Sequence, residues 1–193
     1  MARILLVEDD ALVRHGISRM LVAAGHELRV ASRGAAGVDE AALFDPQLVV
    51  LDVGLPDFDG IECARRLRAA RYAGPIVFLT ADGSPDTVRA AIGLGAHSYM
   101  VKPITGTQLL PVVLTALAAA DAAHERERRM QTALDDSRRI SAAVGVLAER
   151  HGTSTTAAFE LLRGRARGRS QKVSAAAEEV LSRVEQAPGE TPG

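Results

Sequence analysis

The segment LVVLDVGLPDFDG, residues 48–60, determines how the first part of this sequence is expected to fold. Its first four residues, LVVL, are all apolar, which is typical of a strand that is covered on both faces of a sheet. The apolar run reaches Asp52, so the strand should present a carboxylate at its carboxyl end. We therefore predict a buried strand of a parallel sheet that ends in an acidic side chain.

Four other short apolar runs recur along residues 1–120 at the interval that a strand, a helix and two loops require. They are RILLV (3–7), LRVA (28–31), PIVFLT (75–80) and SYMV (98–101). The segments between them have helical periodicity. The first should end at Gly25, and Ser84 and Pro85 are suited to cap and begin the fourth. Residues 1–120 are therefore predicted to form an α/β domain with a five-stranded, doubly wound parallel sheet.

The sequence of the remainder of the chain predicts a long helix followed by a small all-α domain of three helices. Residues 107–150 carry no strand signal, Gly152 is expected to end the long helix, and Ser154 should cap the next. Residues 168–170 separate that helix from the last one. The predicted boundaries are a helical linker over 121–139, the three-helix domain over 140–186 and a disordered tail over 187–193.

The long helix also contains residues at the 4-3-4-3 spacing of a coiled coil, and a solvent-exposed helix is the alternative interpretation. The residues at this spacing are Met130, Leu134, Ser137, Ser141 and Val144. A homodimer could form through this helix or through the α/β domain.

The composition favours a soluble protein of the cytoplasm. No window approaches 18 uninterrupted apolar residues, so no membrane-spanning segment is expected. Acidic residues within the first ten positions argue against a signal peptide. The single cysteine, Cys63, excludes an internal disulfide, suits a reducing compartment and is expected to be a packed side chain. Because 23 Lys and Arg residues nearly balance 24 Asp and Glu residues, the total charge indicates no class of partner.

Charged and polar side chains follow the predicted strands at the edge where the carboxyl ends of parallel strands meet. They are Glu8, Asp9, Asp52, Thr80 and Lys102. Three carboxylates in one place repel one another unless a cation neutralises them, and hard oxygen ligands favour Mg²⁺. A carboxylate beside Mg²⁺ can act as a nucleophile towards a phosphoryl group, whose charge the metal and a lysine would stabilise.

Four segments, LLVEDD, LDVGLPDFDG, FLTAD and YMVKP, give residues 1–120 a close resemblance to the receiver domain of two-component response regulators. The resemblance implies that a sensor histidine kinase supplies a phosphoryl group to Asp52. It implies that Glu8 and Asp9 form an acidic pair at Mg²⁺, and that Asp52 and the carbonyl of Gly54 also serve the metal site. The resemblance further implies that Thr80 supplies the switch hydroxyl, that Tyr99 is the rotating aromatic residue and that Lys102 binds phosphate. It implies a cis peptide bond between Lys102 and Pro103. Gly54 and Asp82 would then occupy the positions that tune the phosphoryl lifetime.

Residues 140–181 resemble the ANTAR domain, an RNA-binding antitermination module. The residues that carry this resemblance are Ala143, Gly145, Leu147, Ala158, Phe159, Leu162, Arg165, Ala177 and Val180. Val144 departs from the family, because many members have Lys at that position. The resemblance implies that the protein binds hairpin RNA and promotes transcription antitermination. Phe159 is the only aromatic residue of this part, and its spacing to Leu162 predicts a place in the helical core.

The stretch RGRARGRSQK, residues 163–172, places five cationic side chains in ten residues. We predict that Arg165, Arg169 and Lys172 contact RNA, while Arg163 and Arg167 remain solvated; a charged helix end without a ligand is the alternative. Two other outputs are a DNA-binding helix-turn-helix and a protein-interaction module. Ala and Glu dominate the last helix, where a DNA reader would present Arg, Asn or Gln. Asp52 is expected to accept and lose a phosphoryl group, but no other substrate is expected to be turned over. The chain is therefore not predicted to be an enzyme.

Overall fold

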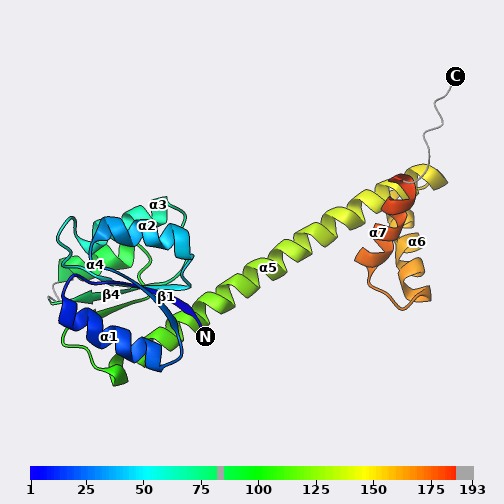
Figure 1. Ribbon diagram of the computed structural model, residues 1–193. Coiled ribbons are helices and arrows are strands. Elements are labelled where there is room, and N and C mark those ends of the chain that lie inside the picture. Colours follow the sequence, from blue (N-terminus) through cyan, green and yellow to red (C-terminus); the bar gives the residue numbers. More distant parts are fainter. Residues whose placement is uncertain (82–84, 186–193) are drawn as a thin grey trace. The chain divides into compact units, whose positions relative to one another are not determined.

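The computed structural model describes residues 1–81 and 85–185, and its N-terminal part is a five-stranded parallel sheet with helices on both faces (Figure 1). The strand order is β2-β1-β3-β4-β5. The strands are β1 (Arg3–Val7), β2 (Glu27–Ala31), β3 (Leu48–Asp52), β4 (Ile76–Thr80) and β5 (Ser98–Val101). The predicted α/β fold is therefore confirmed, and β3 has a strand on each side with Val7 and Phe78 as the neighbours of Leu51.

Five helices belong to this part of the chain: α1 (Ala11–Ala23), α2 (Gly34–Phe44), α3 (Gly60–Ala69), α4 (Pro85–Gly93) and the first turns of α5 (Gly106–His151). Alternate residues of each central strand point to opposite faces of the sheet. Val49 and Leu51 belong to a core that α2, α3 and α4 cover, whereas Leu48 and Val50 belong to a second core under α1 and α5. The run LVVL is apolar throughout because both faces of the sheet are covered.

The helix boundaries of this part follow the sequence signals closely. The side chain of Asp10 caps α1, and α1 ends before Gly25, whose φ of 82° lies in the left-handed region that glycine adopts without strain. The helix α4 begins at Pro85, as expected. Ser84 and Asp82 lie outside the described residues, as does the predicted tail over 187–193.

The remaining helices form a second compact unit, which begins at Glu125. It contains the rest of α5, then α6 (Thr155–Gly168) and α7 (Val173–Glu185). The side chain of Ser154 caps α6, and Gly152 has a φ of 59° after the end of α5. The core of this unit consists of Ala143, Val144, Leu147, Ala158, Leu162, Ala166, Ala176, Ala177 and Val180. A long helix followed by two shorter ones matches the predicted order.

One expectation about this helical unit was wrong, and one position of the possible coiled-coil seam is buried within the unit. Phe159 is 38% exposed and lies outside the core, because the buried positions 158, 162 and 166 repeat every four residues and leave it beside that face. Val144 cannot complete a coiled-coil seam, because it is only 9% exposed and packs in the core of its own unit. The other apolar seam residues, Met130 and Leu134, remain exposed.

By length and composition alone, the long helix α5 could span a membrane, although it contains no uninterrupted apolar run of 18 residues. It contains an 18-residue window with a mean hydropathy of 1.3, and 17% of that window is buried. Leu109, Val113 and Ala116 of α5 pack in the core beneath the sheet, so part of its apolar character serves the fold.

Candidate functional site

The carboxyl ends of the central strands bring the predicted acidic residues together. Glu8 follows β1 and is fully buried, while Asp52 ends β3 and is 4% exposed. Asp9 is exposed at the mouth of the same site. One carboxylate oxygen from each of the three residues lies within 4.8 Å of the others. Such proximity requires a compensating positive charge.

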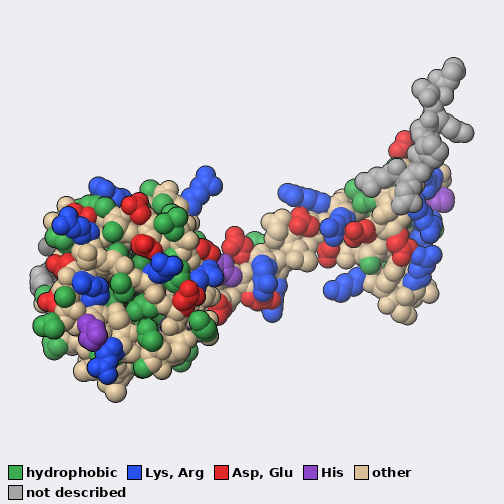
Figure 2. Space-filling model, viewed as in Figure 1, with side chains coloured by type: hydrophobic (Ala, Val, Ile, Leu, Met, Phe, Trp, Pro, Cys, Tyr) green, Lys and Arg blue, Asp and Glu red, His purple; other side chains and the backbone are tan. Residues whose placement is uncertain are grey.

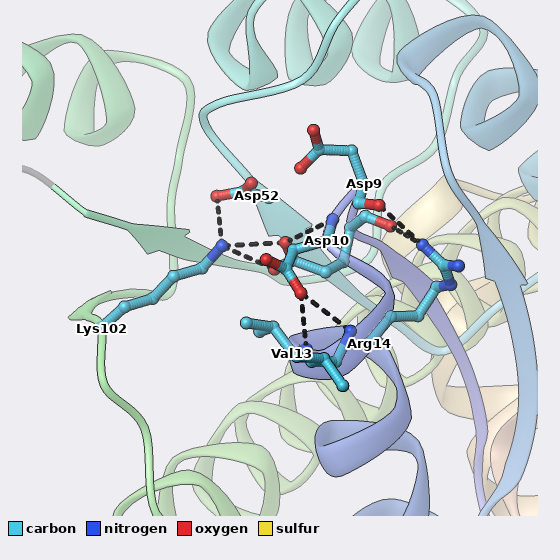
Figure 3. A network of polar contacts seen from close by, with 8 residues as sticks. Asp9, Asp10, Val13, Arg14, Asp52 and Lys102 are labelled. Carbon is cyan, nitrogen blue, oxygen red and sulfur yellow. Dashed lines mark hydrogen bonds and ion pairs between the residues drawn. The ribbon is translucent and has the colours of Figure 1, made fainter.

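Lys102 supplies one such charge from the loop after β5, and Figure 3 shows its ammonium group next to Asp52. Its Nζ lies 2.7 Å from Oε2 and 2.9 Å from Oε1 of Glu8, and 3.1 Å from Oδ1 of Asp52. Burial works against the ammonium, but the hydrogen bonds to Glu8 and Asp52 outweigh it and raise the pKa of Lys102. Lys102 therefore carries a full positive charge at neutral pH.

The backbone positions Lys102 across the edge of the sheet. The peptide bond between Lys102 and Pro103 is cis, as the resemblance implied. The amide of Lys102 donates to the carbonyl oxygen of Thr80 at 2.7 Å, so the end of β4 and the lysine loop are directly joined. The side chain of Thr80 is buried beside them at 3% exposure. Tyr99, on β5, is half-buried and packs against the core on the α2, α3 and α4 side.

The donor set fits a hard divalent cation. Carboxylate oxygens are the protein ligands that Mg²⁺ prefers, and an exposed position such as Asp9 leaves room for the waters that Mg²⁺ retains. Gly54 lies two residues beyond Asp52, and a Cβ atom there would be 3.6 Å from Oδ2 of Asp52. The backbone of Gly54 is thus adjacent to the aspartate, where the resemblance places a carbonyl ligand.

A fourth acidic residue, Asp10, caps helix α1 and is not part of the acidic cluster, a role that sequence reasoning had not assigned to it. Its Oδ1 accepts hydrogen bonds from the amides of Leu12 at 2.8 Å and Val13 at 3.0 Å. These bonds, with Val13 the larger contributor, lower the pKa of Asp10. Arg14 then donates to the carbonyl oxygens of Glu8 and Asp9, at 2.8 and 2.9 Å (Figure 3). The start of α1 therefore fixes the backbone that carries the acidic pair.

The loop after Asp52 is attached to the start of α2 by Asp57, which sequence reasoning also did not identify. Its two carboxylate oxygens accept from the amides of Gly34 and Ala35, each at 2.9 Å. The ring of Phe58 covers Gly34 so closely that a Cβ there would lie 2.3 Å from it. The sequence gives no local signal for this contact, because residues 34 and 57 are far apart along the chain.

We expect Asp57→Ala to lower the thermal midpoint of unfolding by roughly a few degrees, because two amides at the start of α2 lose their partner. The bond from Ala35 is the main reason why the pKa of Asp57 is lowered. A lowered pKa means that the stabilisation is complete above the ordinary aspartate pKa of about 3.9 and is lost as the pH falls through the lowered value. Thermal unfolding monitored by circular dichroism measures the change. The matched control is Asp39→Ala on the exposed face of α2, and an equal loss in both variants would contradict this role.

Cys63 of α3 is expected to be unreactive in the folded protein. Its thiol is fully buried and lies 3.6 Å from the carbonyl oxygen of Gly34. Burial, reinforced by the nearby charge of Asp57, raises the pKa of the Cys63 thiol to about 12. Labelling with a disulfide reagent at about pH 8 should be at least about 100-fold slower in native than in urea-denatured protein. Comparable rates in the two states would show that the thiol is accessible.

In the second unit, the predicted RNA-contacting residues Arg165, Arg169 and Lys172 are all exposed. Arg169 forms an ion pair with Glu179 of α7, which the sequence did not indicate. Arg163 pairs with Glu160 of its own helix at 3.1 Å. Figure 2 shows Lys and Arg side chains gathered along the α6 side of this unit.

Comparison with known families identifies both parts of the chain. Residues 4–114 match the response regulator receiver domain, and residues 128–181 match the ANTAR domain. The chain belongs to the response regulator family. This response regulator is 34% identical over 183 residues to the transcriptional regulatory protein PdtaR of Mycobacterium tuberculosis, covering 93% of this chain and 89% of that protein. The combination of a receiver and an ANTAR output is therefore established.

Two further relatives are similar in the receiver part. The cell cycle transcriptional regulator CtrA of Caulobacter vibrioides is 35% identical over 108 residues, which cover 56% of this response regulator and 47% of CtrA. The crystal structure of the chemotaxis protein CheY4 of Vibrio cholerae has a TM-score of 0.58 and 29% identity, covering 60% of this chain and 98% of that one. The similarity to PdtaR, in contrast, extends through the ANTAR part.

Proposed function

We propose that this response regulator is phosphorylated on Asp52 by a sensor histidine kinase and then controls transcription antitermination by binding RNA hairpins through its ANTAR domain. The observation that carries the first half is the ion-pair network at the sheet edge. A buried Glu8 and a nearly buried Asp52 share one lysine beside a third, exposed carboxylate. The oxygen atoms of these three residues and of the Gly54 carbonyl would hold Mg²⁺, which would neutralise charge on the phosphoryl oxygens.

Each residue of the site would have a separate role in phosphoryl transfer. A carboxylate oxygen of Asp52 attacks the phosphorus, the bond from phosphorus to the kinase histidine breaks, and an acyl phosphate forms. Lys102, now 3.1 Å from Oδ1 of Asp52, would pair with the incoming phosphoryl oxygens. The hydroxyl of Thr80 would bond another of these oxygens, and Tyr99 would change its orientation in response. The added charge of about −1.5 to −2 is enough to favour a different surface conformation.

The RNA half of the proposal is supported by the ANTAR match and by the basic character of α6. Arg165, Arg169 and Lys172 are exposed and cationic, and guanidinium groups can contact phosphates and stack on unpaired bases. The name of PdtaR, a transcriptional regulatory protein, agrees with a role at the level of transcription. We place this activity in the cytoplasm, with a second copy of the chain as a partner through the exposed residues Met130 and Leu134 of α5 or through the receiver.

A gel-shift comparison tests the output. The full-length protein is titrated against a pool of RNA hairpins with randomised loops and against duplex DNA, at about 50 and 200 mM salt. We expect the RNA pool to be bound more tightly, and a phosphodonor to increase that binding. Preference for duplex DNA would indicate a helix-turn-helix output, and binding to neither nucleic acid would indicate a protein partner.

A further inference from the structure

A groove of about 440 Å³ lies between α6 and α7 of the ANTAR part. Three arginines line it, Arg165 and Arg169 from the end of α6 and Arg183 from α7, together with Gly168. One carboxylate, Glu179, projects from α7 into the same lining. The groove is thus a cationic surface with a single acidic side chain within it.

The three arginines differ in their partners. Arg169 forms an ion pair with Glu179, and both side chains are exposed. Within residues 1–81 and 85–185, neither Arg165 nor Arg183 has a hydrogen bond or ion pair through its guanidinium group. Guanidinium groups bind phosphate oxygens through two parallel hydrogen bonds, so two of the three positions are ready to take an anion.

We infer that this groove binds the phosphate backbone of RNA and that Glu179 competes with the RNA for Arg169. The inference rests on the proposed function, since it specifies where the hairpin backbone lies and what opposes its binding. The ion pair between Arg169 and Glu179 is exposed to water and can therefore open at a small cost. When RNA enters, Arg169 exchanges the carboxylate for a phosphate, and Glu179 is left facing the negatively charged backbone.

The adjacent residue, Glu178, provides a matched control. It carries the same charge on the same helix, but its ion-pair partner is Arg139 of α5, at 3.7 Å. Both Glu178→Gln and Glu179→Gln change the net charge by one unit, so long-range attraction to RNA increases equally in the two variants. Only Glu179→Gln releases an arginine in the groove.

We expect Glu179→Gln to bind the randomised hairpin pool about two- to fivefold more tightly at about 50 mM salt, and Glu178→Gln to bind within about 1.5-fold of the parent protein. The advantage of Glu179→Gln should shrink at about 200 mM salt, because an exposed ion pair is screened. Fluorescence anisotropy of the labelled pool measures both affinities. Equal affinities of the two variants would overturn the assigned competition.

The location of the phosphate site is tested separately from the competition. Arg165→Ala and Arg183→Ala should each weaken binding and reduce the slope of log affinity against log salt by about 0.7. Arg163→Ala should leave the salt slope unchanged and alter the affinity only through the long-range effect of one charge, because Arg163 lies outside the groove and is paired with Glu160. If the Arg163 variant loses as much as the other two, the phosphate site is not in this groove.

Two glycines allow a steric test that leaves the charges unchanged. A Cβ atom at either Gly164 or Gly168 would meet nothing within 4 Å, so both positions of α6 accept a side chain. Gly168 lines the groove and Gly164 does not. Gly168→Leu should therefore weaken RNA binding by about tenfold, whereas Gly164→Leu should preserve it. Circular dichroism confirms that each variant keeps its helical content.

The outcomes also separate this inference from the proposed function. If the parent protein prefers duplex DNA or binds neither nucleic acid, the proposed RNA output fails and the groove assignment fails with it. If the parent protein binds the hairpin pool but none of the groove variants differs from its control, the RNA output stands and the groove assignment alone is overturned.

Discussion

Asp52→Asn is expected to abolish phosphorylation of the protein and to remove all stimulation of RNA binding by a phosphodonor. The amide that replaces the carboxylate is not a nucleophile towards phosphorus, and it no longer carries the charge that Mg²⁺ requires. Asn has nearly the same shape as Asp, so β3 and the packing around it should persist. The ion pair between Lys102 and Glu8 is also independent of the substituted group.

The measurement follows phosphoryl incorporation from a small-molecule phosphodonor by intact-protein mass spectrometry, with and without Mg²⁺. Asp10→Asn is the matched control, because it removes a neighbouring acid but keeps the side-chain oxygen that caps α1. We expect the control to incorporate one phosphoryl group and Asp52→Asn to incorporate none. Continued stimulation of RNA binding in Asp52→Asn would place the phosphorylation-dependent step at another residue.

The sequence predicted the parts of the molecule that depend on local patterns. The run LVVL specified a strand covered on both faces, and the acidic and basic residues after each strand converge because parallel strands end at one edge. Glu8, Asp52 and Lys102 therefore meet as expected. Ser154 at its cap position likewise agreed with the helix boundary that the structure shows.

The contacts that the sequence did not predict join residues that are distant along the chain. The bonds of Asp57 to the start of α2 span 23 and 22 residues, and the pair between Arg169 and Glu179 joins two helices. Phe159 was misplaced because its spacing to Leu162 suits a helix face. The small residues Ala158 and Ala166 instead complete the buried face with Leu162. In such an alanine-rich bundle, size and hydrophobicity alone do not identify the core.

Gly60→Ala is expected to destabilise the receiver strongly, because the start of α3 approaches the end of β3 closely at residue 60. A Cβ atom at residue 60 would lie 2.1 Å from the carbonyl oxygen of Asp52 and 2.8 Å from Cα of Val53. Both are backbone atoms, so the overlap can be relieved only if the end of β3 moves. The amide of Gly60 also donates to the carbonyl oxygen of Val53 at 2.9 Å, which holds the two segments together.

Gly60→Ala should therefore lower the free energy of unfolding of the receiver by about 3 kcal/mol and reduce phosphorylation, because the displaced backbone carries Asp52. The two tyrosines of the protein, Tyr72 and Tyr99, both lie in the receiver, and there is no tryptophan. Tyrosine fluorescence during urea unfolding consequently reports on this domain. The control is Gly16→Ala in α1, where a Cβ meets nothing within 4 Å and helix propensity should add about 0.5 to 1 kcal/mol. The opposite signs of the two changes in unfolding free energy distinguish a steric requirement at Gly60 from a general effect of replacing glycine. An unchanged free energy of unfolding in Gly60→Ala would show that the end of β3 can move without loss of stability.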